Sequence, residues 1–139
     1  LIYTIFLMSR VQTGEADMLT EDGKVFLDEQ LEIRRLALDG PAVFLGHCAS
    51  EALRDQKGVV KVFIRCGNEN QVRERIAEDY GIGQSEIDST RKHYNKKRAG
   101  YYRANTGKEW RDMNNYDLVL DSAALGIDGC VNVLKGLFE

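Results

Sequence analysis

The chain has 139 residues, enough for one domain with a single hydrophobic core. Its formal net charge of -3 at pH 7 argues against a general nucleic-acid binder, and no apolar run is long enough to span a membrane. The three cysteines are an odd number without metal-ligand spacing. They predict reduced thiols in a cytoplasmic protein, and the two histidines, His47 and His93, offer no third metal ligand.

The first 24 residues are predicted to be a mobile or helical lead-in. Residues 1–8 are apolar but too few to decide between helix and strand, and they lack the flanks of a signal peptide. Residues 10–23 are polar, hold two glycines and read as a loop. A cap at Thr20 or Asp22 then leads into the first amphipathic helix.

That helix is predicted over residues 25–38, with an apolar face formed by Leu27, Leu31 and Leu38 and with Ile33 and Leu36 on its neighbouring edges. A strand over 41–46 follows, and its unbroken apolar run indicates that helices cover both of its faces. The strand ends at Gly46 and turns into a short helix over 48–56. Ligands of open parallel sheets bind beyond the carboxyl ends of strands, which places His47 at a candidate ligand site. A packed histidine at a strand end is an equally good interpretation.

The remaining elements continue the alternation of strands and helices. Strands are predicted over 59–65 and 116–121, and helices over 69–80, 84–103 and 127–138. Asn68 and Gly81 are typical residues to begin and end the helix over 69–80. This order predicts one α/β domain with a mainly parallel sheet. Within it we expect a core over 25–82, a basic lid over 83–115, and a last strand and helix over 116–139.

Positive charge is concentrated in residues 91–111, where eight cations face a single acid, Glu109. The cations are Arg91, Lys92, Lys96, Lys97, Arg98, Arg103, Lys108 and Arg111. Acidic partners one helical turn away are almost absent, and aromatic residues (Tyr94, Tyr101, Tyr102 and Trp110) lie between the cations. We therefore expect this stretch to bind phosphate groups. A solvated helix face and an RNA-binding surface are the alternatives, and a steep salt dependence would indicate RNA.

Two phosphate-binding motifs are absent from the sequence. It contains neither Gly-x-x-x-x-Gly-Lys-[Ser/Thr] nor Gly-x-Gly-x-x-Gly. Nothing in these 139 residues therefore predicts the usual cradle for a triphosphate.

Several segments, taken in order, resemble the cytidylate kinase-like family over residues 25–137. They are Gly40-Pro41-Ala42-Val43-Phe44-Leu45-Gly46-His47-Cys48-Ala49, Val62-Phe63-Ile64, Arg73-Glu74-Arg75-Ile76, Asn95-Lys96-Lys97-Arg98-Ala99-Gly100-Tyr101-Tyr102, Thr106-Gly107-Lys108-Glu109-Trp110, Tyr116-Asp117-Leu118-Val119-Leu120-Asp121-Ser122 and Leu125-Gly126-Ile127. The resemblance implies a three-layer P-loop kinase-like fold with a helical basic lid. It also implies transfer of the γ-phosphoryl group of ATP to a nucleoside monophosphate, with Mg²⁺ neutralising charge.

The resemblance also implies site residues. His47 stands where the family usually has an arginine that meets the monophosphate, and Arg75 matches an arginine that reaches the same phosphate. Arg91 and Arg98 match catalytic lid arginines. Asn95 stands where an aspartate usually helps to read the cytosine amino group. The substitutions at His47 and Asn95 leave the acceptor base open, and they leave open a catalytically degenerate module that binds a nucleotide or a protein partner.

The P-loop strand of this family lies between the strands predicted here at 41–46 and 59–65. The resemblance therefore implies a fold that is incomplete at its N-terminus. Either a P-loop strand precedes Leu1, or another segment fills the slot, because two inner strands with unpaired backbone are costly. Homo-oligomer formation is also left open.

Overall fold

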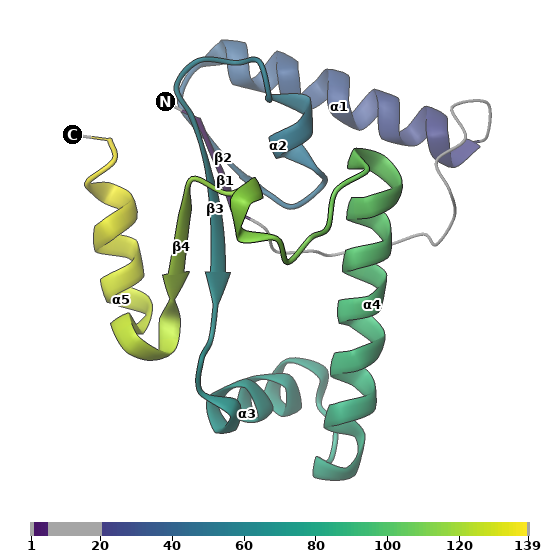
Figure 1. Ribbon diagram of the computed structural model, residues 1–139, viewed down its shortest axis with the longest axis vertical. Coiled ribbons are helices and arrows are strands. Elements are labelled where there is room, and N and C mark those ends of the chain that lie inside the picture. The colour runs from purple at the N-terminus through teal and green to yellow at the C-terminus, as the bar shows by residue number, and fades with distance from the viewer. Residues whose placement is uncertain (1, 6–20, 139) are drawn as a thin grey trace. The chain divides into compact units, whose positions relative to one another are not determined.

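The computed structural model describes residues 2–5 and 21–138. Its elements alternate between strands and helices, as the sequence predicts (Figure 1). In chain order they are β1 (Ile2–Ile5), α1 (Glu21–Asp39), β2 (Ala42–Leu45), α2 (Ala49–Ala52), β3 (Val59–Arg65), α3 (Glu69–Tyr80), η1 (Gln84–Glu86), α4 (Ile87–Thr106), η2 (Met113–Asn115), β4 (Leu118–Asp121) and α5 (Ser122–Lys135).

The four strands form one sheet in the order β2-β1-β3-β4. β1 is parallel to both of its neighbours, with Ile2 opposite Ala42 of β2 and Val59 of β3. The predicted α/β class with a parallel sheet is therefore confirmed. β1 occupies the slot that the resemblance assigns to a P-loop strand, so a segment of this chain pairs with β3 and with β2, which lies at the edge of the sheet. Of the two alternatives that the sequence left open for residues 1–8, the structure shows a strand at Ile2–Ile5, and residues 6–20 of the expected mobile or helical lead-in lie outside the described residues.

The chain divides into two compact units. The first comprises Leu1–Phe63 and Lys97–Leu118, and the second comprises Ile64–Lys96 and Val119–Glu139. β3, α4 and β4 each run from one unit into the other. The single domain expected from the sequence stays a prediction.

Helix α1 turns a different face to the core from the one that the sequence pattern predicts. Ile33 and Ala37 are buried, and they pack with Ala49, Ala52 and Leu53 around α2. The predicted face is instead exposed: Leu27 is 38% exposed, Leu31 62% and Leu38 77%. α1 carries two apolar stripes, and the buried one also includes Gln30, whose side chain donates to the His47 carbonyl at 3.0 Å.

The second core cluster of the first unit is aromatic. Cys48, Tyr102 and Trp110 are its buried members, and Phe26, Phe63, Ala99 and Tyr101 pack against them. Phe63 meets the Trp110 ring edge-on with centroids 5.7 Å apart. The Tyr116 hydroxyl donates to the carbonyl of Trp110 at 2.6 Å. This cluster joins the end of α4 to the loop before β4 and to the strand β3.

In the second unit, the predicted ends of α3 are confirmed. The Asn68 side chain accepts a hydrogen bond from the N–H of Gln71, and Gly81 adopts the left-handed conformation. α5 differs from prediction because it begins at Ser122 and kinks at Gly126, where φ is 69°. The kink rotates the following turns, so Cys130 is buried while Ile127 is 78% exposed. The stripe of apolar residues one turn apart on this helix is therefore not its buried side, since Ile127, Val131 and Phe138 are 78%, 41% and 49% exposed.

Candidate functional site

A left-handed turn ends β2 and presents His47. Gly46, His47 and Cys48 all have positive φ angles, of 71°, 55° and 50°. For the two residues with a Cβ, this conformation costs about 1–2 kcal/mol each. The Gln30 side chain holds the turn by donating from Nε2 to the His47 carbonyl at 3.0 Å. Cys48 is buried, which raises the pKa of its thiol to about 12, while the His47 side chain stays 44% exposed.

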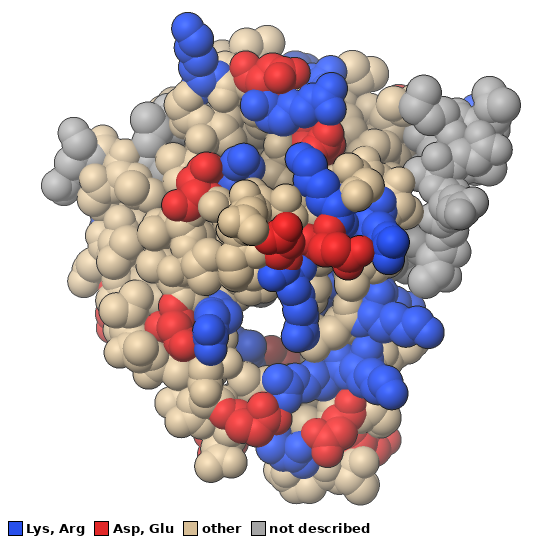
Figure 2. All heavy atoms as spheres, viewed as in Figure 1, with Lys and Arg blue, Asp and Glu red and all other residues tan. Residues whose placement is uncertain are grey.

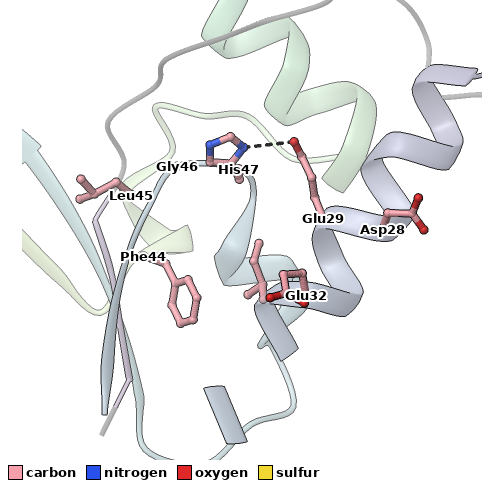
Figure 3. A pocket seen from close by; sticks show the side chains of 8 residues that line it. Asp28, Glu29, Glu32, Phe44, Leu45, Gly46 and His47 are labelled. Carbon is pink, nitrogen blue, oxygen red and sulfur yellow. Dashed lines mark ion pairs between the residues drawn. The ribbon is translucent and has the colours of Figure 1, made fainter. Parts of the chain in front are cut away.

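A pocket of about 420 Å³ lies between this turn and α1. Its lining comes from Asp28, Glu29, Glu32 and Ile33 of α1 and from Phe44, Leu45, Gly46 and His47. Figure 3 shows that Phe44 points from β2 toward α1, while Glu29 reaches toward His47. The volume lies within the range of small-molecule sites, and the pocket is at the carboxyl end of a strand in a parallel region of the sheet.

Carboxylates dominate the charge of this pocket. Glu29 Oε1 lies 3.5 Å from His47 Nδ1, and Glu29 Oε2 lies 3.4 Å from the hydroxyl of Tyr101 on α4. Burial raises the pKa of Tyr101, so its hydroxyl stays protonated and donates to the carboxylate. Asp28 and Glu32 add two further negative charges to the lining. A group that donates hydrogen bonds, such as an amino group on an aromatic ring, therefore fits this lining better than a phosphate does.

Some cations of the basic stretch form ion pairs, both with an acid of the stretch itself and with an acid of another element. Figure 2 shows Lys and Arg atoms gathered over α4 on the right of the view, with Asp and Glu atoms among them. Arg103 pairs with Glu109 at 3.1 Å, and Lys108 reaches Glu51 of α2 at 3.4 Å. Arg111 lies over the Trp110 ring, 5.5 Å from its centroid. Arg103 and Lys108 are therefore paired although acids one turn away are almost absent, the first with an acid of the same stretch and the second with an acid of another helix.

The aromatic residues of this stretch serve the core in part. Tyr102 is 4% exposed and Trp110 is 9% exposed, and both pack against Cys48. Tyr94 is 37% exposed and stacks on Tyr80 of α3, with centroids 4.8 Å apart. Tyr102 and Trp110 therefore lie between the basic residues because they pack in the core. The alternation of aromatic and basic residues is for this reason a weaker sign of ligand binding.

Three predicted site residues lie in the second unit. The Arg91 guanidinium forms an ion pair with Glu69 of α3. Asn95 lies one helical turn further along α4 and is half-buried. Arg75 is exposed on α3, and no ion pair involves it among residues 2–5 and 21–138. Its neighbour Arg73 is paired with Asp88 and donates to the Gln84 carbonyl at 3.3 Å. Arg75 is thus the more available of the two arginines.

The other two predicted residues, His47 and Arg98, belong to the first unit. Arg98 is half-buried on α4. Joint action of His47, Arg75, Arg91, Asn95 and Arg98 on one ligand stays a prediction. Sequence reasoning missed the acids that line the pocket. Their spacing at 28, 29 and 32, on the helix that leads into β2, was the available signal.

The described residues do not form a recognisable binding site for a metal ion or a triphosphate. No group of three or more His, Cys, Asp or Glu side chains in the described part of the chain could hold a metal. The sequence also lacks the glycine-rich phosphate motifs. Among the helices that the structure describes, none has the length and apolar character of a membrane span. The three cysteines are free, and Cys48 and Cys130 are buried.

Comparisons with known proteins identify relatives in sequence and in fold. A family model described as the cytidylate kinase-like family matches residues 2–124. A solved structure, of an uncharacterized protein from Eubacterium ventriosum ATCC 27560, is similar with a TM-score of 0.80 and 18% sequence identity. That similarity covers 100% of this chain and 99% of the other chain, and at this identity it supports the fold alone. No curated protein matches the sequence.

Proposed function

Because the chain belongs to the cytidylate kinase-like family, we propose that it is a nucleotide-binding phosphotransferase. It would pass the γ-phosphoryl group of ATP to a nucleoside monophosphate. The observation that carries this proposal is the family match over most of the chain. The pocket at the end of β2 supports it, since its volume suits a nucleoside-sized ligand and its position is the usual one for ligands of parallel sheets. A three-layer P-loop kinase-like fold in the cytoplasm is part of the same proposal.

The pocket suggests how the acceptor would bind. Its carboxylates would accept hydrogen bonds from the base, and Ile33 and Phe44 would contact the ring. The phosphate of the acceptor would then lie outside this acidic lining, near the exposed edge of His47. Arg75 and Asn95 are proposed to contact the acceptor, as their matched positions do in the family.

Arg98 and Arg91 are proposed as the catalytic residues. Phosphoryl transfer needs positioning of the two substrates and neutralisation of the charge on the transferring group, and arginines supply both. The proposal implies ATP and Mg²⁺, but the described residues do not fit a triphosphate or a metal ion. No step of the reaction is therefore assigned to residues that would hold them.

The test combines calorimetric titration with a coupled assay of ADP formation in the full-length protein. ATP and the four common nucleoside monophosphates are titrated separately, and turnover is then measured for each acceptor. Arg98→Ala is expected to reduce turnover by about 10³-fold, the loss typical of removing a charge-stabilising arginine, with little change in Tm. Arg54→Ala, which removes an exposed arginine outside the predicted site, serves as the control. Unchanged turnover in Arg98→Ala would remove Arg98 from the site.

A binding module without catalysis is the second candidate. Its supporting observation is that two residues proposed to meet phosphate are already paired with acids, His47 with Glu29 and Arg91 with Glu69. Nucleotide binding without turnover in the full-length protein would favour this candidate. Absence of binding for every nucleotide tested would contradict both candidates.

A further inference from the structure

Helix α1 carries an exposed stripe of leucines that belongs to neither core cluster of the described residues. Leu27, Leu31 and Leu38 are 38%, 62% and 77% exposed. Their spacing, with Arg34 between the last two, follows the alternating four- and three-residue steps of a coiled-coil seam. The core-facing residues Ile33 and Ala37 lie on a different side of the helix. The leucine stripe is thus a second apolar seam that is accessible from solvent.

The charges beside this seam are arranged to suit a second copy of the same helix in the opposite direction. Asp28 and Arg35 are two helical turns apart on one edge of the seam, and both are exposed. An antiparallel copy places Arg35 of the second helix beside Asp28 of the first, and the reverse pair forms by symmetry. A parallel copy would not bring these two charges together, because each would then face the opposite edge of the partner's seam. Within the described residues Asp28 has no ion pair, whereas Arg35 pairs with Glu32 and Asp39 of its own helix.

We propose that two copies of this protein associate through α1 in antiparallel orientation. Leu27 of one copy packs against Leu38 of the other, and Leu31 lies beside the two-fold axis. Arg34 falls in the seam near that axis, and its Nε donates to the carbonyl of Ala52 at 2.9 Å. A single helix of 19 residues is about 28 Å long, so the interface is at the small end of specific interfaces. The dimer is therefore weak and forms reversibly at micromolar concentrations.

Sedimentation velocity of the full-length protein over a concentration series tests the proposal. The wild type is expected to shift from monomer to dimer as concentration rises from about 1 to about 200 μM, the range for a small interface. Leu31→Glu is expected to be monomeric throughout. Leu36→Glu is the matched control, because Leu36 is 40% exposed on another side of the same helix and should leave the shift unchanged. Circular dichroism of each variant verifies that the helix content is retained.

A charge exchange then tests the orientation. Asp28→Arg and Arg35→Asp are each expected to weaken association about five-fold, and the double variant is expected to recover the wild-type dissociation constant. A wild type that stays monomeric at every concentration overturns the proposal. A dimer that persists in Leu31→Glu, or one that the double exchange fails to restore relative to the single variants, also overturns it.

Discussion

The carboxylate of Asp121, at the end of β4, accepts a hydrogen bond from the backbone N–H of Gly67 at 2.9 Å. The same oxygen accepts the N–H of Ala123 at 3.0 Å and so caps α5, while the second oxygen lies 3.4 Å from Nε of Arg65. One side chain thus connects the loop after β3 to the first turn of α5. The hydrogen bonds from Gly67 and Ala123, together with the Arg65 guanidinium, hold the ends of β3 and β4 in place.

Replacing Gly67 with alanine is expected to disturb this connection. A Cβ at position 67 would lie 2.5 Å from Oδ2 of Asp121 and 3.3 Å from the Arg65 guanidinium. The carboxylate has to rotate to relieve the clash, and the rotation weakens its hydrogen bonds to Gly67 and Ala123. We expect Gly67→Ala to lower the free energy of unfolding by about 1–2 kcal/mol. Urea denaturation measures this change.

A double-mutant cycle provides the control for that result. In an Asp121→Ala background the clash is absent, so the further change Gly67→Ala should cost much less than it does in the wild type. Equal costs in the two backgrounds would show that the contact with Asp121 is not the cause.

The same carboxylate predicts a dependence of stability on pH. The hydrogen bonds from Gly67 and then Ala123, with a smaller contribution from Arg65, lower the pKa of Asp121 below its ordinary value of 3.8. A lowered pKa in the folded state contributes stability above the ordinary value, and this contribution is lost as pH falls through the folded pKa. Asp121→Asn keeps a hydrogen-bond acceptor but cannot carry the charge.

We therefore expect the stability difference between wild type and Asp121→Asn to be constant from about pH 7 to pH 5 and to narrow below about pH 4. Denaturant titrations at several pH values measure it. A difference that stays constant down to pH 2 would mean that the charge of Asp121 does not contribute.

The elements of this chain could be predicted from its sequence more closely than the faces they bury. β3 and α3 have the predicted bounds, because β-branched residues define the strand and Asn68 and Gly81 define the helix ends. The orientation of α1 could not be predicted, since its buried side includes the polar Gln30, whose partner is a carbonyl at the end of β2. The spacing of apolar residues predicts which side of a helix is hydrophobic. It does not predict a hydrogen bond from a polar side chain such as Gln30 to a turn 17 residues away.

Two alanine substitutions on α1 test which face is buried. Ile33 is 8% exposed in the core cluster, and Ile33→Ala is expected to cost about 2–4 kcal/mol of unfolding free energy. Val25 is 54% exposed, and Val25→Ala should change the free energy of unfolding by less than about 0.5 kcal/mol. Thermal or urea unfolding at low protein concentration measures both. Similar costs for the two variants would contradict the described orientation of the helix.

The place of the candidate pocket in the chain could be predicted, but the acidic charge of its lining could not. Gly46 and His47 were placed correctly at the end of β2, because a glycine after an apolar run is a strong sign of a strand end. The acidic lining depends on how α1 packs beside β2, which local sequence does not encode. For the same reason the partner of Arg91, Glu69 on another helix, could not be predicted.

The Arg91–Glu69 pair leads to a prediction about ligand binding that depends on the proposed function. If Arg91 contacts a phosphate group, it has to leave Glu69 first, so the pair competes with the ligand. Glu69→Gln removes the competing charge and is expected to tighten nucleotide binding about two- to five-fold, since an exposed ion pair is worth about 1 kcal/mol or less. Arg91→Ala is expected to weaken binding. Glu74→Gln, which removes an exposed acid from the same helix, controls for the change in net charge. Calorimetric titration with ATP and with the acceptor measures the dissociation constants of all three variants. Equal tightening by Glu69→Gln and Glu74→Gln would mean that the change in net charge, and not the loss of the ion pair with Arg91, causes the effect.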